Sequence, residues 1–464
     1  MIKLNSVFET SLNPLRYSNI KIVFIANLIL GLINGFYNVI LQPYIVQFIK
    51  SEKKLGLILT ISSMIQSSSL ILTAKVSDKR GRRVTYLSSI FLFILAFALF
   101  SQSRNLFIVI SALLLFSFAF GIREPAKQAL TAESSEEKKK TSSFTFVNLA
   151  FYSAGLVGPL IIRIFSQKVD LRIYFYLLFG GFVFLYIYQL FFLRESLLIE
   201  NVKWSLKKDF IQSIISIPII IKTFFTSFVR LVSIPFYLFR TKILKRRNID
   251  SEFFKEVEKE VELYNSIFKI PGLKYALSFF IFDSFLWGLS ISIFNGSAIL
   301  VYSFTEGDIA EFTLFFNFST IVVFMIFVSF ADKVKNNEIL VMSEVSGSLF
   351  ITLNIIAFFT APEFRKYAIW IAWIGLGASV AFWVPGIQSI MTGFDKQRRA
   401  EAYGTVSGLQ SLGWLPTSLI AGLIIEKTSF LIPFLITLTF LPIDIYFAYK
   451  FPERKKEMDN SPKP

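Results

Sequence analysis

The chain has 464 residues, of which 54% are hydrophobic and 17% charged, and its formal net charge is +16. Soluble domains contain about 45–50% apolar and about 25% charged residues, so these proportions exclude an ordinary soluble enzyme or binding protein. The chain contains no cysteine and no histidine, which excludes disulfides, thiol chemistry, zinc sites built on those residues and imidazole proton relays.

Apolar runs of membrane-spanning length recur along the chain. A helix needs about 20 apolar residues to cross the bilayer core. Twelve runs approach this length, namely 20–49, 55–76, 84–101, 105–123, 142–166, 172–193, 273–302, 312–331, 338–360, 366–392, 401–425 and 429–449. The sequence therefore predicts an all-α membrane protein with twelve helices. The first eighteen residues lack the layout of a cleaved signal peptide, so we expect the first run to be an uncleaved anchor.

The charges between the runs predict the orientation in the membrane. Lysine and arginine gather in the turn 75–83, in 123–140, in the central segment and in the tail 450–456, whereas the turn 303–311 holds three acids and no base. Because basic loops remain on the cytoplasmic side, we expect a multi-pass protein of the cell membrane with both termini in the cytoplasm. The same distribution accounts for the positive charge without nucleic acid as a partner.

The turn between the second and third runs carries the most specific pattern. Asp78, Gly81, Arg82 and Arg83 follow one another as Asp-x-x-Gly-Arg-Arg, with Ala74 four positions before the aspartate. This turn resembles the signature loop of the major facilitator superfamily, in which a glycine stands where this chain has Ala74. The resemblance implies a fold of two six-helix bundles related by a pseudo-twofold axis along the membrane normal. It also implies that these four residues latch the halves together; the alternative is a basic turn that only sets topology.

The second half of the chain repeats landmarks of the first. Asp332 lies 254 residues after Asp78, and Pro385 lies 260 residues after Pro125. Two halves of like orientation fit the parallel-repeat architecture of transporters, and we assign Asp332 to the same latch. The predicted divisions are an N-terminal bundle over 1–193, a linker over 194–271, a C-terminal bundle over 272–450 and a cytoplasmic tail over 451–464.

The long linker has an amphipathic middle. Polar residues recur at helical spacing between Lys208 and Arg240, apolar residues fill the other face, and Pro218 and Pro235 should kink or break a helix there. We favour a pair of amphipathic helices lying in the inner membrane interface, with Lys242, Lys245, Arg246 and Arg247 among the cations near the lipid head groups. A re-entrant hairpin is the alternative.

The fifth run contains a small-residue motif. Gly155, Gly158 and Pro159 resemble the Gly-x-x-x-Gly-Pro element associated with exporters of the family, although Ile162 and Arg163 stand where its further glycines would be. Small residues also let any two membrane helices approach closely. We therefore favour helix packing as the role of this motif.

Asp283 is the most informative single residue. It lies about halfway along the seventh run, where a carboxylate is costly unless it faces a cavity or a partner. Trp287 and Ser290 follow on the same helical face. We predict that these three residues contact the substrate or a coupling proton or cation; a structural hydrogen bond to a neighbouring helix is the alternative.

A stripe of amides marks the first run. Asn34, Asn38 and Gln42 share one helical face, and buried amides in a membrane need polar partners or water. They are expected to line the cavity or to join helices, and the resemblance favours lining. Glu344 and Asp444 lie near predicted cytoplasmic helix ends and receive less weight. The fourth run lacks the arginine of the family's proton-driven exporters, since 108–116 is uncharged.

These observations predict a secondary transporter that moves a small molecule by alternating access. Few charges in the expected cavity favour export of amphipathic compounds; uptake of a sugar or organic acid is the alternative within transport. A membrane receptor or lipid-handling protein on the same fold is the alternative from another class. The sequence shows no Walker-type loop and no metal-ligand motif, so we expect neither an enzyme nor a cofactor.

Overall fold

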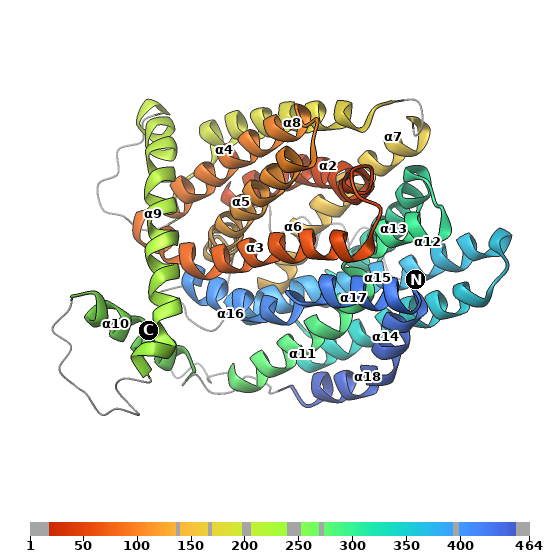
Figure 1. Ribbon diagram of the computed structural model, residues 1–464. Helices are drawn as coiled ribbons and strands as arrows, with labels where there is room; N and C mark the ends of the chain where they lie inside the picture. Colours follow the sequence, from red (N-terminus) through yellow and green to blue (C-terminus); the bar gives the residue numbers. More distant parts are fainter. Residues whose placement is uncertain are drawn as a thin grey trace.

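The computed structural model describes residues 18–135, 140–165, 169–196, 206–238, 252–268, 273–392 and 399–451. Within these ranges the protein is helical throughout and contains no strand (Figure 1). The predicted tail beyond residue 451, the basic stretch from Lys242 to Arg247 and most of the segment before the first run lie outside the described residues.

Seven helices build the first half of the molecule. They are α2 (Ser18–Val46), α3 (Glu52–Arg80), α4 (Arg82–Ser101), α5 (Leu106–Glu133), α6 (Lys140–Gly155), α7 (Val157–Phe165) and α8 (Leu171–Phe192). Polar side chains cap several amino ends: Ser51 accepts from the backbone of Lys54, and Asn105 accepts from that of Ile108. Such caps satisfy backbone N–H groups that have no partner within the helix.

Eight helices build the second half. They are α11 (Leu273–Ile291), α12 (Phe294–Tyr302), α13 (Glu306–Phe327), α14 (Asn336–Phe359), α15 (Pro362–Thr392), α16 (Arg399–Trp414), α17 (Thr417–Lys427) and α18 (Leu431–Tyr449). Breaks divide α6 from α7 and α16 from α17, close to Pro159 and Pro416. Matching breaks in the two halves agree with the internal repeat.

Among the described residues, thirteen helical segments are long and apolar enough to cross a membrane. Twelve of them correspond to the predicted runs, and the twelve-helix membrane fold is confirmed. The thirteenth, Lys208–Arg230, belongs to the linker. The two halves lie side by side with their helices roughly along a common axis (Figure 1). They meet where α3 packs against α16 and α17 and where α6 and α7 pack against α13.

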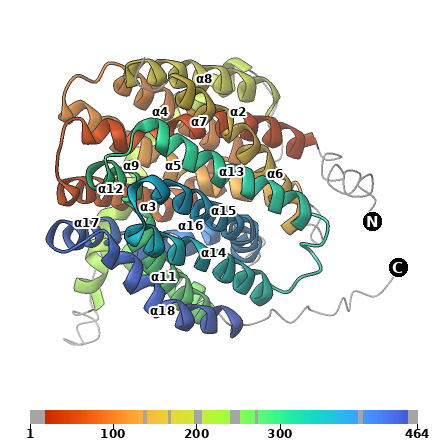
Figure 2. The ribbon, with the colours of Figure 1, turned by 90° about the vertical axis from the view of Figure 1, so that its right-hand side faces the viewer.

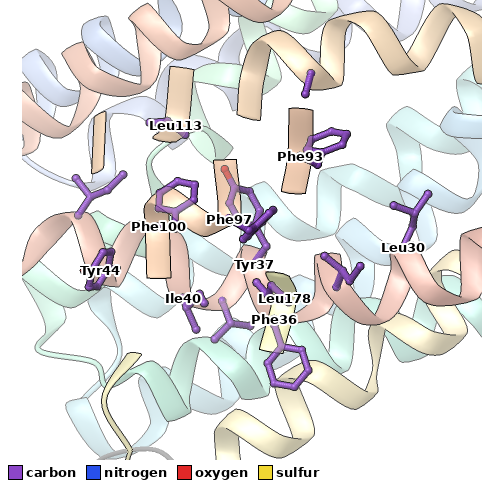
Figure 3. Close-up of a cluster of buried hydrophobic side chains, with 14 of the residues drawn as sticks. Leu30, Phe36, Tyr37, Ile40, Tyr44, Phe93, Phe97, Phe100, Leu113 and Leu178 are labelled. Atoms are coloured by element: carbon purple, nitrogen blue, oxygen red, sulfur yellow. The ribbon is translucent and has the colours of Figure 1, made fainter. Parts of the chain in front are cut away.

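We call the end of the bundle that carries Gly81 the Gly81 end and the opposite end the far end. The helices α2, α4, α5 and α8 of the first half enclose an aromatic core between these ends (Figure 3). Phe97 stacks on Phe182 and Phe100 on Phe175, with ring centroids 5.0 and 4.9 Å apart. Offset and edge-to-face ring pairs stabilise such a core beyond the area they bury.

Glycines set the closest helix contact in the first half. Gly158 lies against the backbone of Gly35 and Phe36, and a side chain at Gly35 would collide with the carbonyl oxygen of Gly155. Pro159 lies beside Gly35 as well. The predicted small-residue motif therefore lies where α2 crosses α6 and α7, a position in which only residues without bulky side chains fit.

The linker forms α9 (Leu206–Leu238) and α10 (Glu252–Phe268). Pro218 and Pro235 were predicted to kink or break a helix, and the structure contradicts a break, because α9 continues through both. A proline removes one backbone hydrogen bond, and the remaining bonds of a 33-residue helix maintain it. The helix runs across the bundle at its Gly81 end rather than along it (Figures 1 and 2).

A surface helix of a soluble protein buries its apolar face and exposes its polar face, whereas α9 does the reverse. Asp209, Ser213, Ser216 and Ser227 are buried, whereas the exposed large side chains include Ile215, Phe225 and Val229. Ser213 illustrates the inner face, since its hydroxyl pairs with that of Tyr186 at 2.6 Å. The polar face of α9 packs against the bundle and its apolar face is exposed, as expected of a helix in contact with lipid.

Candidate transport cavity and charge clusters

The predicted latch turn is held by carboxylates of the first half and of the linker that follows it. Gly81 has φ 108°, a backbone conformation that favours glycine. Arg82 is fully buried and pairs with Asp78 and with Glu133, whose oxygen lies 2.9 Å from Nη2. Glu195 accepts from the backbone nitrogens of Arg82 and Arg83 at 2.9 and 3.1 Å. A buried cation needs carboxylate partners of this kind, so these bonds fix the conformation of the turn.

Arg83 connects the turn to the linker. Its guanidinium forms an ion pair with Asp209 of α9 and donates to the carbonyl oxygen of Leu190 at 2.8 Å. Both partners of the ion pair are almost completely buried. The position of α9 is therefore coupled to the predicted latch through a charge pair that is costly to break on one side only.

Asp332, the counterpart of Asp78 in the repeat, reaches across the two halves. It accepts from the hydroxyl of Ser142 and, at 3.2 Å, from the backbone nitrogen of Ser142 at the amino end of α6. A carboxylate at a helix amino end is favoured by the unpaired N–H groups and the helix dipole there. This contact joins the halves at the Gly81 end, where Asn148 also donates to Gln388 at 2.8 Å.

At the far end, charged residues join the halves. Arg163 of α7 pairs with Glu311 of α13, and Lys366 lies 2.6 Å from Glu311 and 2.6 Å from Asp308. Arg163 was considered in the sequence only as a departure from the exporter motif. Its partner is 148 residues away, so no local pattern pointed to the pair.

A central cavity of about 640 Å³ lies between the halves. Asn38 and Gln42 of α2 line it, together with Asp283 and Trp287 of α11. Gln42 also bridges the halves, because it donates to the carbonyl oxygen of Ser292 at 3.1 Å and accepts from the nitrogen of Gly296 at 2.7 Å. A cavity of this size at the interface between domains suits a small organic molecule.

The third member of the amide stripe lies outside the cavity lining. Asn34 is half-buried and is not among the residues that line the cavity. Asn27, one heptad earlier, donates to the carbonyl oxygen of Val147 at 3.0 Å and so joins α2 to α6. Both expected roles occur on one helix face, with cavity lining toward the far end and helix joining toward the Gly81 end.

A second cavity of about 430 Å³ continues the first toward the Gly81 end and shares Gln66, Trp383 and Gln410 with it. Arg123, Glu124 and Lys127 of α5 line this part. Glu124 pairs with Arg123 and lies 3.0 Å from Nζ of Lys127. Arg123 and Glu124 are both buried and face the cavity.

Three carboxylates converge in the second half. Asp283 of α11, Glu344 of α14 and Asp444 of α18 each place an oxygen within 4.8 Å of the others, and all three are buried. Among the described residues, none of the three forms an ion pair with lysine or arginine. We call this set the acid cluster. Glu344 and Asp283 also line the central cavity.

Trp287 and Ser290 occupy different surroundings although they share a face with Asp283. Trp287 lines the cavity and donates its indole N–H to Glu344 at 2.7 Å. Ser290 is buried and its hydroxyl pairs with that of Thr437 at 2.8 Å, which joins α11 to α18. The structure therefore places Asp283 and Trp287 at the cavity and Ser290 in a helix contact behind it.

Sequence reasoning missed the membership of Glu344 and Asp444 in this cluster. Both were given little weight because they lie near helix ends, where water was expected to reach them. The helix ends are packed against neighbours instead, and the exposed fractions are 1% for Glu344 and 0% for Asp444. The signal that could have identified Glu344 and Asp444 is the presence of an acidic residue inside an apolar run, whatever its depth in the membrane.

The comparisons with known proteins agree with this arrangement. A family model described as Major Facilitator Superfamily matches residues 23–413. The chain resembles the xylose transporter XylE from E. coli, solved in a partially occluded inward-open conformation, with a TM-score of 0.65 and 12% identity over 94% of this chain and 99% of that one.

The human organic anion transporter MFSD10 (TETRAN) is also similar. It gives a TM-score of 0.63 and 12% identity, over 93% of this chain and 99% of that one. At such low identity, both likenesses concern the fold. No curated protein sequence matches the chain.

Proposed function

The chain belongs to the major facilitator superfamily of membrane transporters, and from this premise we propose that it moves a small amphipathic organic molecule by alternating access. The observation that carries the proposal is the central cavity, to which both halves contribute. In parallel-repeat transporters the substrate lies near the membrane midplane between the repeats.

Contacts between the halves at both ends of the cavity support alternating access. At the far end, Arg163 pairs with Glu311; at the Gly81 end, Asp332 binds Ser142. Each of these two contacts consists of a few polar bonds. Alternate loss of one set and then the other would open the cavity first to one side and then to the other.

The lining of the cavity favours a substrate with both apolar and polar parts. Four tryptophans supply flat apolar surface and five amide side chains supply hydrogen-bonding groups; these are Trp287, Trp373, Trp383, Trp414, Asn38, Gln42, Gln66, Asn295 and Gln410. Few polar groups placed among aromatic rings fix the orientation of a ligand while the rings supply most of the contact area. Export of such compounds is the direction that we propose.

Uptake of a sugar or a small organic acid is the second candidate. The amides and hydroxyls of the lining could bind a polyol, and Arg123 and Lys127 in the second cavity could bind a carboxylate. The two candidates differ in the side from which the substrate enters and in the need for apolar surface.

We propose that transport is coupled to a cation at Asp283. A buried carboxylate that faces the cavity can respond both to a cation and to a substrate, because each changes the local charge and hydration. Since both ligands meet in one cavity, binding of one can alter the affinity for the other.

Thermal-shift screening of a compound library on the purified chain would identify candidate substrates, because a ligand that binds the folded state raises its stability. Flux of the stabilising compounds would then be measured in proteoliposomes. Accumulation against a gradient supports a transporter, whereas tight binding without flux would favour the receptor alternative. Asn38→Ala should weaken transport, and Gly180→Ala on α8, where an added methyl group meets no neighbour, is the matched control.

A further inference from the structure

The second cavity carries an uncompensated positive charge. The charged residues of its lining are Arg123, Glu124 and Lys127 of α5, which are two cations and one acid. We call Arg123 and Lys127 the basic pair. In the described part of the chain, Glu124 is the one acid that forms an ion pair with either of them. One positive charge therefore remains at a largely buried wall, where an unbalanced charge is costly until an anion joins it.

The guanidinium of Arg123 is held in place by aromatic rings and by Glu124. It lies 5.0 Å from the ring centroid of Phe120 and 5.6 Å from that of Phe93, so cation–π contacts fix its position. Its Nη2 donates to Glu124, whereas the buried Nε has no hydrogen-bond partner among the residues that the structure describes. Glu124 therefore satisfies part of the guanidinium and leaves donor capacity for another acceptor.

The internal repeat shows that the fold does not require these charges. At the offset of 260 residues, the counterparts of the basic pair in the second half are Trp383 and Ile387. Both counterparts line the same second cavity from α15. Equivalent positions thus face one cavity from the two halves, and one half presents cations where the other presents apolar side chains. Because the second half builds its wall without charge, the basic pair is a property of this site and not of the architecture.

The basic pair faces the same space as the aromatic lining of the central cavity. The two cavities share six lining residues, which are Ser63, Gln66, Ser284, Trp383, Gln410 and Trp414. Trp383 and Trp414 therefore border both the part with the basic pair and the central part. A ligand whose anionic group lies at α5 has flat apolar surface beside it, and aromatic rings supply contact area for an apolar body.

Acidic groups in the central cavity limit the charge of such a ligand. Asp283 and Glu344 line the central cavity and are absent from the lining of the second one. A second anionic group placed beside them would meet like charge in surroundings of low dielectric, where repulsion is strong. The distribution of charge along the two cavities therefore favours a ligand with one anionic group, placed at α5.

We propose that the two cavities together bind an amphipathic organic monoanion, whose acidic group binds the basic pair and whose apolar body lies against Trp383 and Trp414. The inference rests on the proposed transport function and deepens it, because it names the class of substrate. Hydrogen bonds between a guanidinium and a carboxylate are roughly twice as strong as those between neutral groups. The basic pair is therefore the feature that distinguishes a carboxylate from its uncharged amide.

A panel of aromatic carboxylates of increasing ring number, each measured beside its neutral primary amide, tests the site by calorimetry on the purified full chain. We expect at least one carboxylate to bind saturably and at least tenfold more tightly than its amide. In Arg123→Gln this preference should disappear, whereas binding of the amide should change little. A panel in which no carboxylate binds more tightly than its amide, or a preference that persists in Arg123→Gln, would overturn the proposal.

Two variants control this measurement. Arg104→Gln removes an exposed cation in the turn before α5 and should keep the preference of the wild type. Arg123→Lys retains the positive charge and should keep a preference for the carboxylate, which a purely structural role of the guanidinium does not explain. Loss of the preference in Arg104→Gln would indicate an effect of overall charge and contradict the site.

Lys127→Gln covers the case in which Arg123→Gln does not fold. Glu124 then keeps Arg123 as its partner, so no buried acid is left without a cation. The preference for the carboxylate should fall in this variant as well, because the second cation of the pair is lost. An unchanged preference in Lys127→Gln would contradict the proposal.

Proteoliposome flux separates this inference from the proposed function. The probe is the carboxylate that binds most tightly, and flux of this compound above that of protein-free liposomes supports both. Flux of neutral or cationic compounds from the thermal screen, together with no preference for any carboxylate, would refute the anion site and leave transport intact. Charge-selective binding without any flux would support the anion site and refute transport.

Discussion

Trp287 donates its indole N–H to Oε2 of Glu344 over 2.7 Å and thereby links the cavity wall on α11 to a buried carboxylate on α14. Asp283 lies one helical turn before Trp287 and faces the same cavity. An aromatic ring that can contact a substrate is thus bonded directly to the acid cluster. One hydrogen bond therefore connects a side chain that can contact the substrate with the carboxylates proposed to take part in coupling.

The first prediction concerns Asp283. In Asp283→Asn the cavity loses an ionisable carboxyl group, so cation binding and the transport coupled to it should fall by at least tenfold, while the amount of protein in the membrane stays unchanged. Substrate flux in proteoliposomes with and without an ion gradient measures this. Asp170→Asn should transport like the wild type. Gradient-driven flux at wild-type level in Asp283→Asn would remove the residue from the coupling step.

The second prediction concerns the signature turn. Asp78 pairs with the fully buried Arg82, and its replacement by asparagine leaves that cation with Glu133 as its remaining ion-pair partner. Breaking a buried pair on one side is destabilising by roughly 3–5 kcal/mol. We expect Asp78→Asn to cut transport severely while insertion into the membrane is preserved, as measured by flux and by surface labelling. Lys79→Ala, an exposed change in the same turn, should have little effect.

The third prediction concerns the far end. Glu311→Gln removes the acid that pairs with both Arg163 and Lys366, and we expect the far end to open more often. Because partly exposed ion pairs contribute about 1 kcal/mol or less, the open population should rise by up to about fivefold. The rate at which an Asn38→Cys reporter is labelled from the far side measures this. Asp170→Asn, which breaks an ion pair within one turn, should leave the rate unchanged.

The fourth prediction concerns helix packing. A methyl group at Gly158 would collide with the backbone of α2, whereas one at Gly180 meets nothing. Overpacking of this kind costs about 1–3 kcal/mol, so Gly158→Ala should lower the temperature of thermal unfolding. Gly180→Ala should be neutral or slightly stabilising, since alanine favours helix more than glycine does. Equal unfolding temperatures for the two variants would contradict the described contact.

The fifth prediction concerns orientation. The chain has no cysteine, so single introduced cysteines give an unambiguous signal. Lys79→Cys at the Gly81 end should resist a membrane-impermeant thiol reagent added outside intact cells, and Arg104→Cys at the far end should react. The physical reason is that basic loops remain in the cytoplasm. The reverse labelling pattern would contradict the predicted topology.

Much of the architecture could be predicted because each membrane-spanning helix requires a continuous run of apolar residues, which is visible in the sequence. Hydrophobic thickness dictates runs of about 20 apolar residues, and each run can be recognised without knowledge of its neighbours. The turn from Asp78 to Arg83 and its partial repeat at Asp332 are likewise local patterns. The twelve helices and the family membership therefore followed from residues that lie close together in the sequence.

The site was decided by contacts between distant segments. Asp283 was recognisable because a carboxylate at mid-membrane depth is costly, but its partners Glu344 and Asp444 stand on helices whose mutual placement no local pattern specifies. The same holds for α9, where the sequence showed two faces and only packing determined that the polar face turns toward Arg83 and Tyr186. The periodicity of polar and apolar residues can be read along a single helix. Which side chains are buried, and which of them pair, depends on which helices pack together.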